Sequence, residues 1–168
     1  MRTLYLLRHA KSSWDEQLIA DHDRPLAPRG RKDARAMCDH LRTLETPPEL
    51  ILCSSSVRTR QTLDLVAPAM PDAEVETEDG IYAASASALL ARLNELADGV
   101  ESVMVIAHNP GLEQLAGRLA DDGAAGIQAA GKFPTCALAT LTFEGEWAAL
   151  SDGGAELADF AVGRQLRG

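Results

Sequence analysis

Two histidines and two arginines of this sequence stand where apolar segments end. Arg8 and His9 come directly after the first such segment, and His108 comes directly after a later one. Arg58 comes after a further apolar segment and the three serines that follow it. Neutral imidazole is a nucleophile, and guanidinium groups bind oxyanions through paired N–H donors. A histidine held between arginines could attack phosphorus in line, form a phosphohistidine and be released by water. These residue types therefore favour phosphoryl chemistry, in which fixed positive groups stabilise the transition state.

The pattern of apolar residues predicts the elements that bring these side chains together. Short apolar runs predict buried strands, a weaker run predicts one more, and helical spacing predicts the segments between them. The predicted strands are 3–7, 50–53, 75–77 and 102–107, and the predicted helices are 29–44, 57–66, 86–96 and 110–119. Strands that alternate with helices pair in parallel, and ligands bind beyond the carboxyl ends of such strands. His9, Arg58 and His108 are thus expected at one edge of the sheet.

The end of the chain predicts a different arrangement. Residues 136–143 and 146–150, separated by Glu144-Gly145, indicate an antiparallel hairpin, and the small residues of 123–131 indicate a loop or short helix. We therefore expect an α/β protein, a three-layer α/β/α sandwich with a mostly parallel central sheet and an antiparallel edge hairpin. A length of 168 residues, 46% of them hydrophobic, fits one domain over 1–168.

Charge and hydropathy exclude several classes of protein. The net charge of −9 argues against nucleic-acid binding, although residues 1–60 hold 11 of the 16 basic residues and could build a local anion site. No apolar run approaches the length of a membrane span, and the apolar N-terminal stretch is too short for a signal peptide. The sequence therefore predicts a cytoplasmic protein that binds neither nucleic acid nor a membrane.

Cysteine and histidine spacing gives no sign of a metal. The cysteines, Cys38, Cys53 and Cys136, form no C-x-x-C pair and are predicted to be buried free thiols. Neither H-E-x-x-H nor H-x-H occurs, and arginines beside the histidines would repel a cation. We expect no metal and no other cofactor.

Four motifs, in order along most of the chain, resemble those of the histidine phosphatase superfamily. Leu7-Arg8-His9-Ala10 resembles the Arg-His-Gly signature of that family. The others are Arg24-Pro25-Leu26 with Arg29-Gly30, Ser54 to Arg58 with Gln61 and Thr62, and Ala107-His108-Asn109-Pro110. The short chain is similar to the phosphohistidine phosphatase branch of SixA type, which implies a phosphoglycerate mutase-like fold.

The resemblance also implies roles for particular residues. His9 would be the nucleophile, and Arg8, Arg58 and His108 would be catalytic residues that bind the phosphoryl group. The implied enzyme is a phosphoric hydrolase, most simply a monomer without a metal. Its substrate would be phosphohistidine in a signalling protein or a small phosphorylated compound.

The sequence departs from the family pattern at two points. Ala10 replaces the signature glycine, which requires a negative φ at this position. A general acid is also hard to find, because Glu78 and Asp79 are candidates by position only and Asp15 is a further one. A missing acid suits a phosphoramidate, since protonated imidazole leaves more readily than an alkoxide.

Other functions are compatible with the same residues. The alternatives are a phosphatase of small phosphate monoesters, a non-catalytic phosphate-binding module of the same fold, and a protein that stores phosphate on His9. Surface positions are expected for His22, His40 and Arg60. Trp14 is expected either to wall the site or simply to pack.

Overall fold

The apolar segments form the centre of a six-stranded sheet. In the computed structural model, which describes residues 1–14, 19–120, 127 and 132–167, the strands lie in the order β3-β2-β4-β1-β5-β6. Their bounds are β1 (Arg2–Arg8), β2 (Leu50–Ser54), β3 (Glu74–Glu78), β4 (Ser102–Ala107), β5 (Ala137–Phe143) and β6 (Glu156–Val162). The first four strands are parallel, whereas β5 runs antiparallel to β1 and β6 antiparallel to β5.

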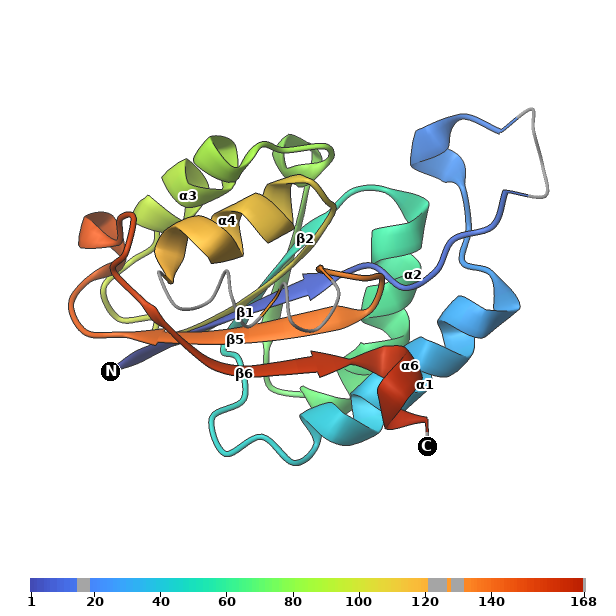
Figure 1. Ribbon diagram of the computed structural model, residues 1–168, viewed down its shortest axis with the longest axis horizontal. Coiled ribbons are helices and arrows are strands. Elements are labelled where there is room, and N and C mark those ends of the chain that lie inside the picture. Colours follow the sequence, from blue (N-terminus) through green and yellow to red (C-terminus); the bar gives the residue numbers. More distant parts are fainter. Residues whose placement is uncertain (15–18, 121–126, 128–131, 168) are drawn as a thin grey trace.

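Helices cover both faces of this sheet (Figure 1). The α-helices are α1 (Pro28–Leu41), α2 (Val57–Val66), α3 (Ala86–Asn94), α4 (Gly111–Leu119) and α6 (Gly163–Leu166). Single 3₁₀ turns are η1 (Asp21–Asp23), η2 (Ala67–Ala69), η3 (Asp79–Ile81) and η4 (Trp147–Ala149). Because α3 and α4 lie on one face and α1, α2 and α6 on the other, the predicted three-layer sandwich is confirmed.

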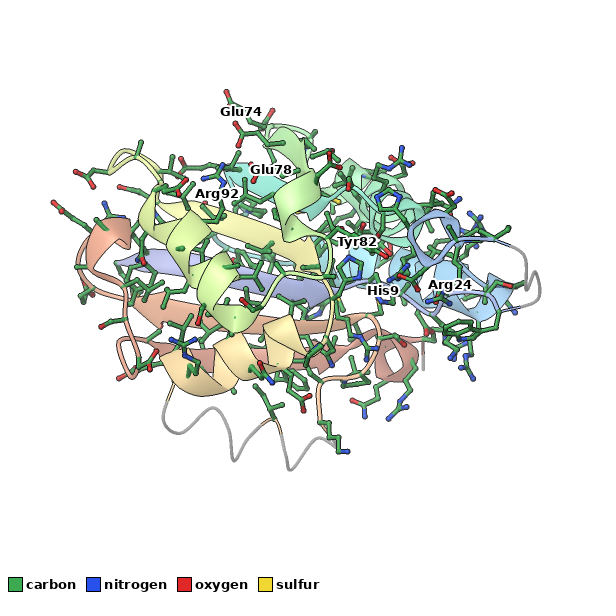
Figure 2. The ribbon with its side chains drawn as sticks, turned by 90° about the horizontal axis from the view of Figure 1, so that it is seen from above. His9, Arg24, Glu74, Glu78, Tyr82 and Arg92 are labelled. Atoms are coloured by element: carbon green, nitrogen blue, oxygen red, sulfur yellow. The ribbon has the colours of Figure 1, made fainter. Side chains whose placement is uncertain are left out.

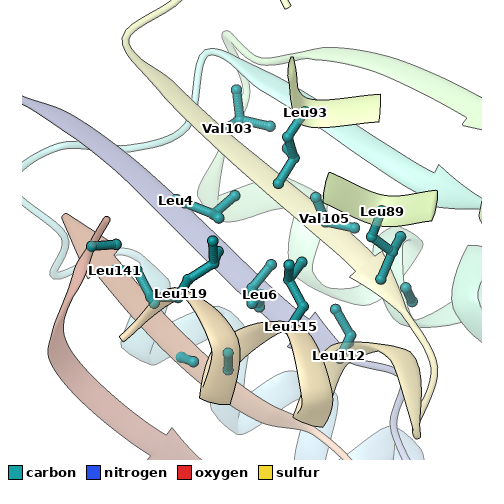
Figure 3. Close-up of a cluster of buried hydrophobic side chains, with 14 of the residues drawn as sticks. Leu4, Leu6, Leu89, Leu93, Val103, Val105, Leu112, Leu115, Leu119 and Leu141 are labelled. Atoms are coloured by element: carbon teal, nitrogen blue, oxygen red, sulfur yellow. The ribbon is translucent and has the colours of Figure 1, made fainter. Parts of the chain in front are cut away.

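The alternation of side chains along β1 divides the core in two. Leu4 and Leu6 are fully buried in the cluster beneath α3 and α4, which Figure 3 shows. Tyr5 and Leu7 point to the opposite cluster, beneath α1 and α2. A strand buried on both faces needs apolar residues at every position, which explains the unbroken apolar run in the sequence.

The predicted hairpin is wrong in its second strand. β5 pairs with residues 156–162, whereas 146–150 lies outside the sheet and contains η4. Trp147 explains the difference, because its ring is fully buried against Phe143 and its Nε1–H donates to the carbonyl of Val100 at 2.6 Å. Burying this large side chain in the core draws the segment away from the sheet edge.

Most of the other predicted elements form. The weak strand and the four helices form with small shifts at their ends, and Cys38, Cys53 and Cys136 are buried free thiols. The predicted loop or helix over 123–131 lies outside the described residues, Ile127 excepted. Among the residues described, none of the helices has the length and apolar character required to cross a membrane.

Candidate active site

Hydrogen bonds on both sides fix His9 at the carboxyl end of β1. Its N–H donates to the carbonyl of Ala107 at 3.2 Å, and its own carbonyl accepts from the N–H of Cys136 at 3.0 Å. The residue is 6% exposed. Its backbone therefore continues the sheet beyond β1, and the imidazole is held by a rigid element instead of a free loop.

The side-chain contacts of His9 define which nitrogen can react. Nδ1 lies 2.7 Å from the carbonyl oxygen of Ala10. A carbonyl only accepts hydrogen bonds, so Nδ1 carries the proton and Nε2 keeps its lone pair. Burial, with smaller contributions from His108 and the charges of Arg58 and Arg8, lowers the pKa of His9 to about 3. At neutral pH the ring is uncharged and able to act as a nucleophile.

His108 lies beside His9 at the end of β4. The two ring centroids are 5.3 Å apart, with the planes tilted by 53°. Nε2 of His108 lies 2.8 Å from Oγ of Ser54, the last residue of β2, and its Nδ1 is buried without a hydrogen-bond partner among the described residues. Burial, followed by the charge of Arg58, lowers the pKa of His108 to about 4.

Arg58 enters the site from the first turn of α2. Ser56 caps this helix by accepting the N–H of Thr59 at 3.4 Å, and this cap places residue 58 facing the strand ends. The Arg58 side chain is buried, and its two Nη groups both donate to Asp21. Its Nε has no hydrogen-bond partner within the described structure.

Arg8 approaches from the last position of β1. Its Nη1 donates to the carbonyl of Phe133 at 3.1 Å, whereas its buried Nε has no such partner in the described chain. Burial lowers the pKa of Arg8, although a guanidinium remains charged at neutral pH. Arg8, Arg58 and His108 therefore all bring a buried, unpaired nitrogen to the neighbourhood of His9.

Helix α2 also holds the loop that follows His9 in place through side-chain hydrogen bonds. Thr62 Oγ1 accepts the N–H of Ala10 at 3.0 Å and donates to the carbonyl of Arg58 at 2.8 Å. Gln61 Oε1 accepts the N–H of Leu26 at 2.8 Å. Ala10 is not among the described residues with positive φ, so its Cβ causes no backbone strain at the glycine position of the family signature.

Asp21 is a site residue that the sequence analysis missed. One of its carboxylate oxygens accepts the hydroxyl of Tyr82 at 2.6 Å, and the other accepts Nε of Arg24 at 3.1 Å. The hydrogen bond from Tyr82, together with those from Arg58, holds the pKa of Asp21 well below its usual range. The available signal was an acid three residues before the Arg24-Pro25-Leu26 motif, within reach of that arginine.

The aromatic rings of Tyr82 and His22 lie at the border of the site. The Tyr82 ring is 4.8 Å from His22 and 5.5 Å from His108, edge to face in both cases. His22 is only partly exposed, and its Nε2 lies 2.9 Å from Oγ of Ser55, so the predicted surface position is a rim position. Trp14 is 67% exposed and stacks on the Arg24 guanidinium at 3.5 Å.

The carboxylates proposed as general acids do not join this cluster. Glu78 accepts three hydrogen bonds from Arg92, and Figure 2 shows this pair away from His9. Asp79 is exposed at the start of η3, and Asp15 lies outside the described residues. Glu78 forms an ion pair with Arg92 and does not contribute its carboxyl group to the site.

Two further polar residues also stay outside the cluster. His40 lies on α1, 4.0 Å from Asp159 of β6, and Arg60 is exposed, with its Nε donating to the carbonyl of Ser55 at 3.0 Å. The expected separation of Arg60 from Arg58 is therefore seen. Among the described residues, no group of three or more metal-ligating side chains comes together.

This geometry suits an oxyanion next to a neutral nucleophile. Arg8, Arg58 and His108 lie close enough to the His9 ring to act on its pKa, and the strand ends and the start of α2 hold them there. Figure 2 shows His9 and Tyr82 near Arg24 at one end of the sheet. A tetrahedral anion bound there would present its central atom to the imidazole.

Comparison with known proteins assigns the family. A model of the histidine phosphatase superfamily, branch 1, matches residues 4–82. An uncharacterized protein of Mycobacterium tuberculosis is 37% identical over 162 residues, covering 94% of this chain and 100% of the relative. The chain belongs to the histidine phosphatase superfamily. Both the family and the fold predicted from sequence are confirmed.

Solved structures place the chain near the SixA proteins of that superfamily. A protein from Agrobacterium tumefaciens, described as a phosphohistidine phosphatase SixA, is 31% identical with a TM-score of 0.82, covering 96% of this chain and 97% of its own. The protein histidine phosphatase SixA complexed with tungstate has the same fold, with a TM-score of 0.78, 24% identity, and coverage of 98% and 99%. Membership of the family supports a phosphatase activity.

Proposed function

We propose that the protein is a metal-independent phosphatase that works through a phosphohistidine on His9. The observation that carries the proposal is the free Nε2 of His9 beside three buried nitrogens without partners, on Arg8, Arg58 and His108. A buried donor without a hydrogen-bond partner lowers the stability of the folded protein, unless a bound ligand accepts its hydrogen bond. A phosphoryl group offers three acceptor oxygens, and it would satisfy all three nitrogens at once.

The hydrogen bond between His108 and Ser54 supports a donor role for His108. Ser54 Oγ accepts the N–H of Ser56 at 3.4 Å, which leaves its hydroxyl proton available for Nε2 of His108. A neutral His108 then carries its own proton on Nδ1, the buried nitrogen without a partner. This tautomer donates a hydrogen bond to the phosphoryl oxygen without adding a second nucleophile.

The reaction then proceeds in two displacements at phosphorus. In the first, the lone pair of His9 Nε2 attacks, the P–Nε2 bond forms, and the bond to the leaving group breaks. In the second, water attacks phosphorus, the P–Nε2 bond breaks, and inorganic phosphate leaves. The arginines stabilise charge on the oxygens throughout, which is work that Mg²⁺ performs in other phosphatases.

Two carboxylates that could have served as proton donors, Asp21 and Glu78, favour phosphohistidine as the substrate because neither is free to act. Asp21 is ionised at neutral pH and hydrogen-bonded to Arg58, so it has no proton to give, and Glu78 is bound to Arg92. An alkoxide leaving group requires a proton from a positioned acid, whereas imidazole departs readily and takes its proton from water. The proposed substrate is therefore phosphohistidine in a signalling protein, as the names of the SixA relatives also suggest.

One comparison of substrates tests this function. Wild-type protein, treated with EDTA, is assayed with a phosphohistidine protein, an aryl phosphate and a panel of alkyl phosphates. We expect hydrolysis of the first two, little of the third, and competition by tungstate, the oxyanion that a SixA protein binds. Preferred turnover of alkyl phosphates would instead indicate a phosphatase of small monoesters, and loss of activity with EDTA would exclude the metal-independent mechanism.

His9→Ala provides the matched variant for the same assay. It should abolish turnover without unfolding, because the strand end loses no part of the apolar core. Labelled substrate should leave an acid-labile, base-stable phosphate on the wild type and none on the variant. Activity of the variant within tenfold of the wild type would disprove the mechanism.

A further inference from the structure

A small cationic cavity lies next to the proposed active site, at the same end of the sheet. It has a volume of about 100 Å³, and its lining includes the side chains of Arg29, Arg164 and Arg167 together with Thr135 and Asp33. Three guanidinium groups against one carboxylate make it positive, in a chain whose net charge is −9. Such a local reversal of charge attracts anionic groups.

The single carboxylate in this cavity is already neutralised. Asp33 is 3% exposed, and its Oδ1 lies 2.8 Å from Nε of Arg167. Arg29 and Arg164 are exposed, and no carboxylate among the described residues pairs with either of them. Two guanidinium groups, with the Thr135 hydroxyl close by, are therefore available to an acidic group from outside.

Backbone hydrogen bonds connect this cavity to His9. The N–H of Cys136 donates to the carbonyl of His9, and the N–H of Gly163 donates to the carbonyl of Cys136, both at 3.0 Å. Thr135 precedes Cys136 and Arg164 follows Gly163 in the chain. Two successive strand spacings separate His9 from Gly163, which is about 10 Å. A ligand that spans this distance could occupy both sites.

Acidic residues gather at the end of the sheet remote from this cavity. The amino ends of the parallel strands and their neighbours carry acidic residues, which are Glu49, Glu74, Glu101, Glu144 and Glu156. These lie at the end of the sheet remote from His9. An acidic protein that approaches the molecule is thus repelled from that end and attracted to the cationic cavity.

We propose that the cavity lined by Arg29, Arg164 and Arg167 binds an acidic side chain of the phosphorylated partner protein. This inference rests on the proposed function, which requires a protein substrate, and it adds where that protein docks. With the backbone separation of His9 and Gly163 as the scale, the carboxylate would lie about 10 Å from the phosphohistidine. On a helix this is a residue about two turns away, since each residue adds about 1.5 Å.

Two phosphohistidine peptides test the docking site. Both form a helix with one phosphohistidine, and one carries Glu seven residues to either side where the other carries Gln. Wild-type protein should hydrolyse the Glu peptide with a kcat/KM about three- to tenfold higher, as expected for two partly exposed ion pairs. The difference should appear in KM and should shrink at high ionic strength.

The double variant Arg29→Ala/Arg164→Ala should lose this preference while its kcat on an aryl phosphate stays unchanged. Arg35→Ala is the matched control, because Arg35 is an exposed arginine of the same helix that lines a different hollow with Asp39 and Asp64. Circular dichroism verifies that both variants fold.

The outcomes separate the two proposals. Hydrolysis of both peptides at equal rates by the wild type, or a preference that survives in the double variant, would overturn the docking site and leave the proposed function standing. Hydrolysis of neither peptide, with the aryl phosphate still cleaved, would overturn the phosphohistidine function and the docking site with it.

Discussion

Asp21 holds the guanidinium of Arg58 through both of its Nη groups. Nη2 donates to the Asp21 carboxylate at 3.0 Å, and Nη1 donates to the Asp21 backbone carbonyl at 2.7 Å. The pair fixes the orientation of Arg58 and leaves its buried Nε without a hydrogen-bond partner in the described structure. The arginine that the sequence predicted as a fork for the phosphoryl group is thus oriented by a carboxylate from the loop after β1.

Substitution of Asp21 should lower turnover by loosening Arg58. We expect Asp21→Ala to reduce kcat on an aryl phosphate about tenfold. This is the lower end of the roughly 10- to 150-fold effect expected when a charged hydrogen bond is lost, because Arg58 itself remains. Asp21→Asn should recover part of the rate, because the amide oxygen can still accept from Nη2. Steady-state kinetics checks this order, and equal rates for Asp21→Ala and the wild type would contradict it.

Substitution of Arg58 itself should be more damaging. Arg58→Ala removes a charge that acts on the phosphoryl oxygens in both the ground and the transition state, so KM and kcat should both suffer, by roughly 10- to 150-fold in kcat/KM. Arg58→Lys should rescue only partly, because ammonium supplies charge without the planar donors that Asp21 orients. Tungstate affinity gives an independent readout. Unchanged affinity and rate in Arg58→Ala would place Arg58 outside the mechanism.

Substitution of Glu78 and Asp79 tests whether any carboxylic acid is used. Glu78→Gln and Asp79→Asn should change the rate on phosphohistidine less than about threefold, because general acid catalysis supplies about 10²–10⁴-fold where it operates. Glu78→Gln should cost only about 0.5–1 kcal/mol in the free energy of unfolding, since its ion pair with Arg92 is partly exposed. A hundredfold loss of rate in either folded variant would show that an acid is in use.

The buried histidines should make the protein less stable in mild acid. His9 and His108 have folded-state pKa values of about 3 and about 4, below their ordinary value, so the unfolded chain takes up protons first as pH falls. Stability should be constant above about pH 6.5 and should fall below it, by about 1.4 kcal/mol for each histidine at pH 5.5. The Asp21 carboxyl is ionised in both states throughout this range and adds nothing to the change.

Urea unfolding at pH 7.5 and pH 5.5 measures this loss. The wild type should lose about 3 kcal/mol between the two values. His9→Gln should lose about half as much, because only one of the two buried imidazoles then remains. Equal stability of the wild type at both pH values would show that these rings are charged in the folded protein.

Much of this site could be predicted from sequence because buried strands are recognisable as short apolar runs. The unbroken apolar runs before His9 and His108 require burial on both faces of a sheet, and parallel strands bring their carboxyl ends to one edge. The three serines before Arg58 likewise indicate the start of a helix. For His9, His108 and Arg58, local pattern and general topology were therefore sufficient to predict that they meet.

Tertiary structure alone decided the placement of Asp21, Trp147 and the cavity around Arg29. Asp21 lies in a polar loop without periodicity, and its position follows from contacts with Arg58 and Tyr82, which are 37 and 61 residues away in the chain. Trp147 lies outside the predicted hairpin because its ring packs in the core. A short stretch of sequence does not show how much space the core offers to such a ring. Arg164 reaches Arg29 only because β6 returns along the sheet edge. Local propensity determines elements, whereas the pairing of distant side chains depends on the energy of the whole packed chain.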